Sequence, residues 1–464
     1  MPDGAPAWAI AKPGPVPWPH DPGVGWLAPV CVIRRHALFP PASRSALPPP
    51  ALSRGVRVRL AAAGRGGSSG FDPELQPLLL RDIARVAHDH PNAYATQTVA
   101  ITRAALDDAE RFTRLLDRLV HDTRFTTVVL AGLPIAARHA QGDIRSIFSC
   151  CDYHVTDDGL RLIEVNTHAS GAIVSALWQA ELTRRGAVQR PVFPNVATVM
   201  ARFLDALEAD WAAFDHRGGR ALRTIAIVDD DPPSQAYFQE FLLAKTLLEQ
   251  RGYRVSIMDA RTARNLDGID LVYNRCCDFY FETPEHAWLL DALLRNAAVF
   301  TPSPRIHALI GRKDVLVYLS EIADGCWPQL GLNAEDLAFL LRIVPRAQFL
   351  VNIDPEAFWD DRKQWVLKPR DRFQGKGVYR GQSLSHATYK KLLREDYVVQ
   401  TQIPPSRTPD GLKSDVRFYH YSKVQFGVAR LYEGQITNFQ SPRGGNAPLV
   451  WARRSRQLFS GHRR

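Results

Sequence analysis

Three side chains with oxygen donors, Asp152, Glu164 and Asn166, are spaced so that a β-hairpin would bring them together. They lie in two segments that read as strands, 149–156 and 160–166. Alternate side chains of a strand share a face, and opposed side chains of a hairpin are in contact. Two carboxylates and an amide are hard oxygen ligands of the kind Mg²⁺ takes, with waters and phosphate oxygens in its remaining positions. The pattern therefore predicts a magnesium site, with a solvated hairpin face carrying coincidental acids as the alternative.

The connection between the two strands sets their register. Residues 157–159, Asp-Asp-Gly, are predicted to form a three-residue loop whose glycine takes the left-handed conformation. Thr156 then pairs with Leu160, and this register places Asp152 directly opposite Glu164.

A second group of candidate residues is cationic and rich in glycine. Lys368 ends a predicted strand, and the loop that follows, 373–378, contains Gln374 and the triplet Gly375-Lys376-Gly377. Ammonium groups and glycine-flanked backbone amides suit a loop that closes over a polyphosphate, although ordinary hairpin turns use the same residues. The sequence has no GxxxxGK[ST] motif, which excludes a P-loop nucleotide site.

Further charged side chains lie in the strands predicted after this loop. Asp415 and Arg417 occupy alternate positions of one strand, where a structural ion pair between them is the alternative to a functional role. Arg430 comes from the next strand, and Asn438 from a strand predicted at 435–439. Their concentration in one segment favours a role beside the phosphates of a nucleotide.

The amino-acid composition is that of a globular protein and argues against a membrane-spanning or disulfide-rich secreted protein. The 464 residues are 45% hydrophobic and 23% charged, a globular composition with room for two or three domains. No apolar run approaches the roughly 20 residues of a membrane-spanning helix. The six cysteines show neither zinc-clamp spacing nor a secreted disulfide framework, which indicates reduced thiols in the cytoplasm.

The net charge of +10 is carried by the two ends of the chain. Residues 1–70 hold Lys12 and seven arginines against two aspartates, and residues 451–464 hold five arginines and no acid. The remainder, 71–450, has a net charge of −1 and offers no basic face for nucleic acid. Thirteen of the 33 prolines also lie in residues 1–70, which are predicted to be disordered and show no secretory signal.

Strands and helices alternate from Thr224 onward, which predicts a small parallel α/β unit. Polar residues follow two of its strands, at the edge where such sheets bind ligands. The run Asp229-Asp230-Asp231 is interpreted as a cap for a helix starting at Pro232-Pro233. Asn274 and Arg275 end another strand, and substrate contact and a structural role are equally good interpretations for them.

Together these motifs resemble the ATP-grasp superfamily in its circularly permuted form, similar to glutathionylspermidine synthetases and their bacterial relatives. The resemblance covers roughly residues 140–450, and the family's acidic hairpin, Asp followed twelve residues later by Glu-x-Asn, falls on Asp152, Glu164 and Asn166. It implies an α/β fold with α+β character, an ATP-grasp fold that is circularly permuted, with an adjoining small parallel α/β domain and N-terminal helices.

The resemblance also implies residue roles and a division of the chain. Mg²⁺ is expected on Asp152, Glu164 and Asn166, and catalytic roles at the triphosphate fall to Asp415, Arg417 and Arg430. ATP is expected to contact Lys313, Lys368, Gln374, Gly375, Lys376, Gly377, Gln400 and Asn438. The implied parts are a disordered tail (1–70), a helical segment with the metal-binding hairpin (71–222), an α/β domain (223–310), the nucleotide-binding lobes (311–450) and a basic tail (451–464).

One position departs from the family pattern. The synthetases carry an arginine two residues before the metal-binding aspartate, whereas this chain has Cys150. Arg145 and Arg430 are the candidates to replace that charge.

The function implied by the resemblance is a cytoplasmic ATP-dependent ligase that joins a small-molecule carboxylate to an amine through an acyl phosphate, with MgATP and without nucleic acid or membrane partners. A small-molecule kinase of the same fold is an alternative. A nucleotide-binding protein without turnover is another, and Cys150 favours it.

Overall fold

The computed structural model describes residues 83, 86–87, 92–214, 219–370, 372, 375–435, 437 and 441–452. They all belong to one compact unit, Gly67–Arg464. The segment predicted to be disordered, 1–70, lies outside the described residues, as do Gln374 and Asn438. Among the described helices, none combines the length and apolar character needed to cross a lipid bilayer.

The largest sheet has seven strands in the order β1-β15-β14-β13-β2-β3, with β12 paired to β13. Its neighbouring strands are antiparallel except for β1 and β15, which are parallel. The strands are β1 (Val99–Ile101), β2 (Ser149–Thr156), β3 (Gly159–Asn166), β12 (Ser406–Arg407), β13 (Lys413–Tyr421), β14 (Lys423–Tyr432) and β15 (Gly445–Trp451).

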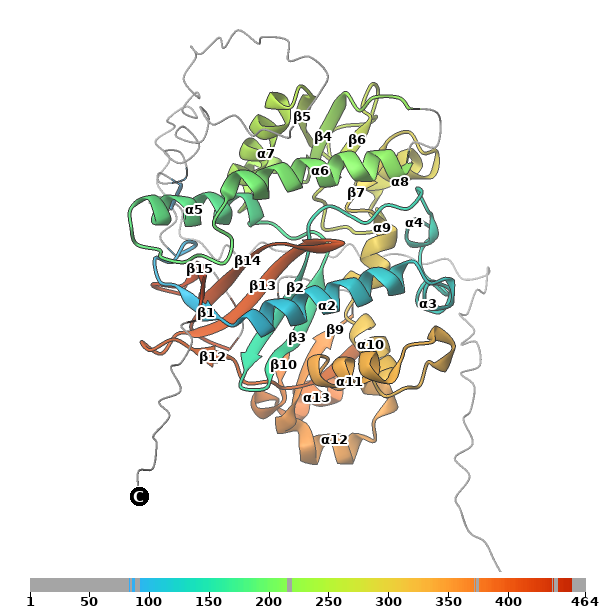
Figure 1. Cartoon of the computed structure of the whole chain (residues 1–464). Helices are drawn as coiled ribbons and strands as arrows, with labels where there is room; N and C mark the ends of the chain where they lie inside the picture. The colour runs from blue at the N-terminus through green and yellow to red at the C-terminus, as the bar shows by residue number, and fades with distance from the viewer. Residues whose placement is uncertain are drawn as a thin grey trace, which may run out of the picture. The chain divides into compact units, whose positions relative to one another are not determined.

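Successive side chains along each strand point to opposite faces of this sheet, and each face packs against a separate hydrophobic core. Cys151 and Phe418 face a core that includes α2, which crosses the sheet in Figure 1. Cys150 and Tyr419 face the opposite core, which includes α5 and α6. The predicted ligand Asp152 shares the face of Cys150, because it is two residues further along β2. The helices of this part are α2 (Arg103–Val120), α3 (Thr123–Val129), α4 (Ile135–Arg138), α5 (Ala172–Arg184) and α6 (Val196–Phe214).

The predicted parallel α/β unit is confirmed as a four-stranded parallel sheet in the order β5-β4-β6-β7. Its central strands, β4 and β6, are fully buried and mostly apolar, and short buried apolar runs between helical segments predict parallel strands from sequence alone. The elements are β4 (Thr224–Asp229), η1 (Pro232–Ser234), α7 (Phe238–Gln250), β5 (Arg254–Asp259), β6 (Leu271–Asn274), η2 (Pro284–His286), α8 (Ala287–Leu294) and β7 (Val299–Thr301).

The third sheet is antiparallel, in the order β10-β9-β11-β8. A small core of its own includes Leu367 and Val399. The elements that precede and form it are α9 (Pro304–Ile306), η3 (His307–Gly311), α10 (Val315–Ala323), η4 (Pro328–Leu330), α11 (Ala334–Ile343), β8 (Ala347–Phe349), η5 (Leu350–Asn352), α12 (Pro355–Asp361), η6 (Arg362–Gln364), β9 (Trp365–Pro369), β10 (Tyr379–Arg380), η7 (Gly381–Ser383), α13 (His386–Leu392) and β11 (Tyr397–Thr401).

Two local predictions are wrong. The strand predicted at 435–439 is absent at its described positions, since Gln435 lies in a bend and Thr437 in irregular backbone. The predicted helix cap at Asp229-Asp230-Asp231 is also wrong: Asp229 is the last residue of β4, Asp230 binds His286, and Asp231 precedes η1 without a capping hydrogen bond from its side chain. The predicted basic tail 451–464 overlaps β15 at Trp451, which pairs with Ile101.

Candidate functional site

The hairpin of β2 and β3 brings the predicted metal ligands together. Asp152 pairs with Glu164, and Gly159 takes a left-handed conformation at φ +110°, as predicted. The predicted pairing of Thr156 with Leu160 is wrong, because Thr156 pairs with Gly159. A bulge in β3 adds one residue before Glu164 and restores the register at Asp152.

The amide of Asn166 links the two carboxylates of the hairpin. Its Nδ2 donates to Asp152 Oδ2 and to Glu164 Oε1, at 3.2 Å in each case. Glu164 keeps about a quarter of its side chain exposed (26%), whereas Asp152 is fully buried. Of the three predicted ligands, Glu164 and Asn166 are therefore partly exposed, and Asp152 is not.

Two arginines hold the buried Asp152. Arg417 stands directly opposite it on β13 and donates through Nε and Nη2 to its two oxygens, at 2.7 and 2.9 Å. Arg430 on β14 reaches Asp152 Oδ2 at 2.9 Å and Asp415 Oδ1 at 2.6 Å. Asp415 and Arg417 thus pair with neighbouring strands, and the interpretation of an ion pair between them is wrong.

These contacts decide the ionisation of Asp152. Burial alone would raise its pKa, but the nearby guanidinium groups of Arg417 and Arg430 outweigh burial and hold the pKa below its usual value. Asp152 is therefore an anion that keeps two cations in place.

Two lysines approach the hairpin from outside the large sheet. Lys313, between η3 and α10, lies with its Nζ 2.8 Å from Glu164 Oε2. Lys368 on β9 donates from Nζ to the backbone carbonyl of Ile163, the bulged residue, at 2.7 Å. It also donates to Gln400 Oε1 on β11 at 2.7 Å, and the amide of Gln400 binds the carbonyl of Leu162 at 3.2 Å.

The electrostatics of the lysines and Glu164 are coupled. Burial lowers the pKa of Lys368 to about 8, although the charge of Glu164 opposes that effect. Burial would raise the pKa of Glu164, but the ammonium groups of Lys313 and Lys368 outweigh it and lower the pKa. Four cationic side chains therefore surround three carboxylates, Asp152, Glu164 and Asp415, leaving one net positive charge.

The triplet Gly375-Lys376-Gly377 forms a turn next to β9. Both glycines are left-handed, at φ +69° and +75°, which explains why glycine stands at both positions. Tyr397 Oη donates to the carbonyl of Gly377 at 3.0 Å and anchors the turn to β11. Lys376 is exposed, and its ammonium acts electrostatically on the thiol of Cys277 in the α/β unit.

Cys150 leaves the arginine position of the family pattern filled by a neutral thiol. Its Sγ is fully buried and lies 3.8 Å from Asp152 Oδ1, and burial raises its pKa to about 12. Arg145 binds Asp117 at 3.0 Å and has no described contact with Asp152, whereas Arg430 does. Of the two candidate replacements, Arg430 is the one placed at the hairpin.

Asn274 and Arg275, the polar residues predicted at the end of a strand of the α/β unit, contact His168, a residue for which the sequence suggested no role. Arg275 donates to the carbonyl of His168 at 2.8 Å and to Ser170 Oγ at 2.5 Å, so it ties β6 to the segment after the hairpin. Asn274 lies 3.3 Å from His168 Nε2 and is fully buried. The position of His168, two residues beyond Asn166 at a strand end, was the available signal.

The donor chemistry of the hairpin fits Mg²⁺ at Glu164 and Asn166, whose hard oxygens are partly accessible. Asp152 differs, because both of its oxygens already accept hydrogen bonds from arginines and it is fully buried. It fits a metal site as the group that orders the surrounding cations and binds Asn166.

Neither a family model nor a curated protein sequence matches the chain. Solved structures of the ATP-grasp ligase PsnB are among those that align with it. The complex with a minimal precursor is 14% identical over 50% of this chain and 90% of that chain, with a TM-score of 0.27. The complex with minimal precursor, Mg and ADP is 15% identical over 48% and 87%, with a TM-score of 0.25. The complex with precursor peptide PsnA2 and AMPPNP is 15% identical over 50% and 89%, with a TM-score of 0.26. Likeness at this level establishes neither fold nor activity, and the ATP-grasp assignment stays a prediction.

Proposed function

We propose that the chain is an ATP-dependent ligase of the circularly permuted ATP-grasp type, which joins a carboxylate to an amine through an acyl phosphate. One observation carries the proposal. Lysines from outside the large sheet, Lys313 and Lys368, converge with Arg417 and Arg430 of that sheet on a hairpin carrying two carboxylates and an amide. A site with excess positive charge beside hard oxygen donors suits a polyphosphate and its divalent cation.

Glu164 and Asn166, with Asp152 behind them, are the residues we assign to Mg²⁺. When bound, the metal supplies charge neutralisation at the phosphate oxygens. Lys313, now paired with Glu164, would exchange that carboxylate for a phosphate oxygen. Gln400, at the end of β11, is assigned to the nucleotide together with Lys368, which it binds.

Arg417 and Arg430 are assigned to the transferring phosphoryl group. Their guanidinium groups are fixed in advance by Asp152 and Asp415, so little reorganisation is needed when negative charge builds up. A substrate carboxylate attacks the terminal phosphorus of ATP, ADP leaves, and the amine then displaces phosphate from the acyl phosphate.

The turn Gly375-Lys376-Gly377 is assigned as the lid of the site. An acyl phosphate is lost if water reaches it, and closure of a lysine-bearing loop would exclude water while adding a positive charge. We assign Asn438 and Gln374 to ATP as well, on the family resemblance. The proposed setting is the cytoplasm, with small-molecule acid and amine substrates.

The test measures ADP release from MgATP in the presence of hydroxylamine and sets of amino acids and short peptides as carboxylates. A ligase of this type releases ADP only with a suitable carboxylate and forms its hydroxamate, because hydroxylamine captures the activated acyl group. Glu164→Gln should reduce turnover at least about a hundredfold, and Asp157→Ala on the hairpin loop is the matched control.

The same assay separates the two alternatives. A kinase releases ADP with alcohols and forms no hydroxamate. A nucleotide-binding protein without turnover, the reading that buried Cys150 favours, binds MgATP and releases no ADP with any acceptor. Hydroxamate formation that Glu164→Gln leaves unchanged would contradict the proposed site.

A further inference from the structure

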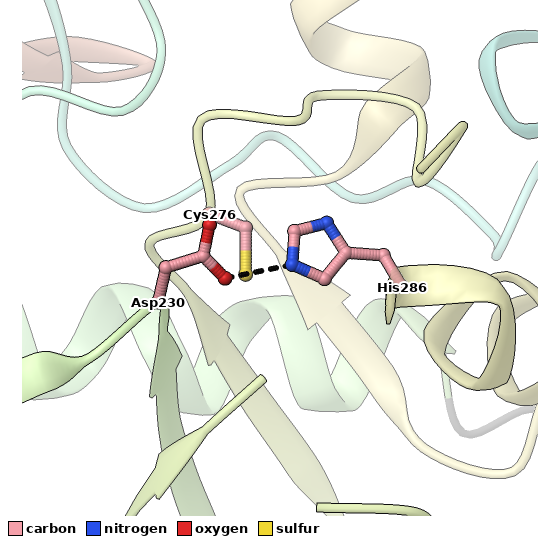
Figure 2. A group of neighbouring side chains, drawn as sticks. All are labelled: Asp230, Cys276 and His286. Carbon is pink, nitrogen blue, oxygen red and sulfur yellow. Dashed lines mark hydrogen bonds and ion pairs between the residues drawn. The ribbon is translucent and has the colours of Figure 1, made fainter. Parts of the chain in front are cut away.

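A second cluster of metal-ligating side chains lies at the carboxyl ends of β4 and β6, outside the hairpin site. Asp230 directly follows β4, Cys276 lies two residues after β6, and His286 ends η2. One donor atom from each lies within 4.8 Å of the other two. Figure 2 shows the three side chains pointing toward one another from separate segments.

The imidazole of His286 has a carboxylate on each side. Its Nε2 lies 2.7 Å from Asp230 Oδ1, on the side of the cluster, and its Nδ1 lies 3.0 Å from Asp278 Oδ2. A carboxylate bound to the far nitrogen of a metal-binding histidine fixes the ring and makes it a stronger ligand. Asp278 therefore stands in the position of the orienting group.

Asp278 is itself held firmly by the loop it belongs to. Its carboxylate accepts backbone hydrogen bonds from Glu282 at 3.1 Å and Thr283 at 2.9 Å, and a third from Thr283 Oγ1 at 2.9 Å. The side chain is thus fixed independently of the cluster.

The thiol of Cys276 faces the same point and is fully buried. Its described hydrogen bond is a weak one, to the carbonyl of Val228 at 3.8 Å. Complete burial excludes it as a nucleophile toward a substrate, whereas a buried thiolate is well suited to bind a metal ion.

We propose that Asp230, Cys276 and His286 bind a Zn²⁺ ion, with Asp278 as a positioning residue and the fourth position open to water. A set of one sulfur, one nitrogen and one oxygen ligand matches the preferences of zinc. The open position lies on the side of Asp230, whose side chain is 38% exposed. Binding replaces the proton on His286 Nε2 and the proton of the Cys276 thiol.

Binding of zinc requires Asp230 and His286 to move slightly apart. Ligand atoms about 2 Å from a tetrahedral zinc stand roughly 3.3 Å apart, so Asp230 Oδ1 has to withdraw from its hydrogen bond to His286. Its partly exposed side chain can do so. The competing explanation for the cluster needs no metal. In it, His286 is protonated and bridges the carboxylates of Asp230 and Asp278.

The test uses untagged, chelator-treated full-length protein titrated with Co²⁺ and then with Zn²⁺. We expect one Co²⁺ per chain, an absorption band from thiolate-to-cobalt charge transfer, and loss of that band when Zn²⁺ displaces the cobalt. Cys276→Ser should abolish the band, and Cys277→Ser, the adjacent and exposed cysteine, is the matched control.

Two further variants guard against misfolding as the cause of lost binding. Asp230→Asn alters the most exposed ligand, and Asp278→Asn should weaken zinc binding about 10–100-fold without removing a ligand. Unfolding midpoints of all variants are measured without metal. The proposal is overturned if the wild type shows no thiolate band, or if Cys276→Ser keeps it.

Discussion

At the scale of single residues, the two carboxylates of the hairpin differ in exposure and in their partners. Asp152 is fully buried and accepts hydrogen bonds from Arg417 and Arg430, whereas Glu164 is partly exposed and faces Lys313. The former orders the cations of the site, and the latter is the accessible group.

This contrast predicts different effects on stability. Asp152→Ala should lower the free energy of unfolding by about 3–5 kcal/mol, because it leaves the largely buried Arg417 without its carboxylate partner and Arg430 with Asp415 alone. Urea denaturation measures the change, and Asp157→Ala on the exposed loop of the same hairpin is the control. If the two variants differ by less than about 0.5 kcal/mol, Asp152 is not the tether described here.

At the scale of elements, the hairpin turn joins the sheet to the helices beside it. Gly159 is left-handed, and the carbon of a methyl group there would lie 2.7 Å from Arg342 Nη1 and 3.1 Å from Asp108 Oδ2. Arg342 of α11 and Asp108 of α2 pair at 2.6 Å, so the glycine leaves room for a link between two helices.

A matched pair of glycines tests this role. Gly132→Ala, at φ +72° with open space around it, should cost about 1 kcal/mol in unfolding free energy from backbone strain alone. Gly159→Ala should cost about 1 kcal/mol more, because it also disturbs the pair of Arg342 and Asp108. Chemical denaturation of both variants gives the comparison, and equal losses would show that the contact contributes nothing.

The sequence predicted these elements well where the pattern was local. The hairpin strands, the pairing of Asp152 with Glu164 and the parallel sheet after Thr224 are confirmed, since alternation and buried apolar runs depend on neighbouring residues. No local sequence pattern indicated the bulge in β3. The turn shifts the register by one residue relative to the prediction, and the bulge shifts it back by one, so Asp152 still pairs with Glu164.

Contacts between distant segments were beyond the sequence pattern. Asp415 and Arg417 looked like partners two residues apart, but each binds a residue on a neighbouring strand. The cluster of Asp230, Cys276 and His286 combines three strand-end and loop segments, and no spacing rule for metal ligands describes it.

At the scale of the whole molecule, buried neutral histidines make stability depend on pH. Burial lowers the pKa of His420 on β13 to about 4, and its Nε2 lies 3.5 Å from Cys151 Sγ. An unfolded histidine titrates near 6.5, so the unfolded chain takes up a proton at a pH where the folded chain does not. The stability contribution is complete above pH 6.5 and is lost as the pH falls toward 4.

The resulting prediction concerns the difference between wild type and His420→Gln. Between pH 7.5 and pH 5 the wild type should lose about 2 kcal/mol of unfolding free energy through this residue, and the variant should lack that loss. Denaturation curves of both proteins at the two pH values measure it. Other buried groups titrate in both proteins, so parallel pH profiles would mean that His420 is not held neutral by burial.

Calorimetric titration with MgATP tests most directly whether the acidic hairpin and Lys368 form a MgATP site. The wild type should bind one equivalent, and Lys368→Met and Glu164→Gln should each weaken binding at least tenfold, a change of about 1.4 kcal/mol. Lys390→Met, at an exposed position of α13, should bind like the wild type. Absence of binding at millimolar MgATP, or equal affinities in all four proteins, would contradict the proposed MgATP site.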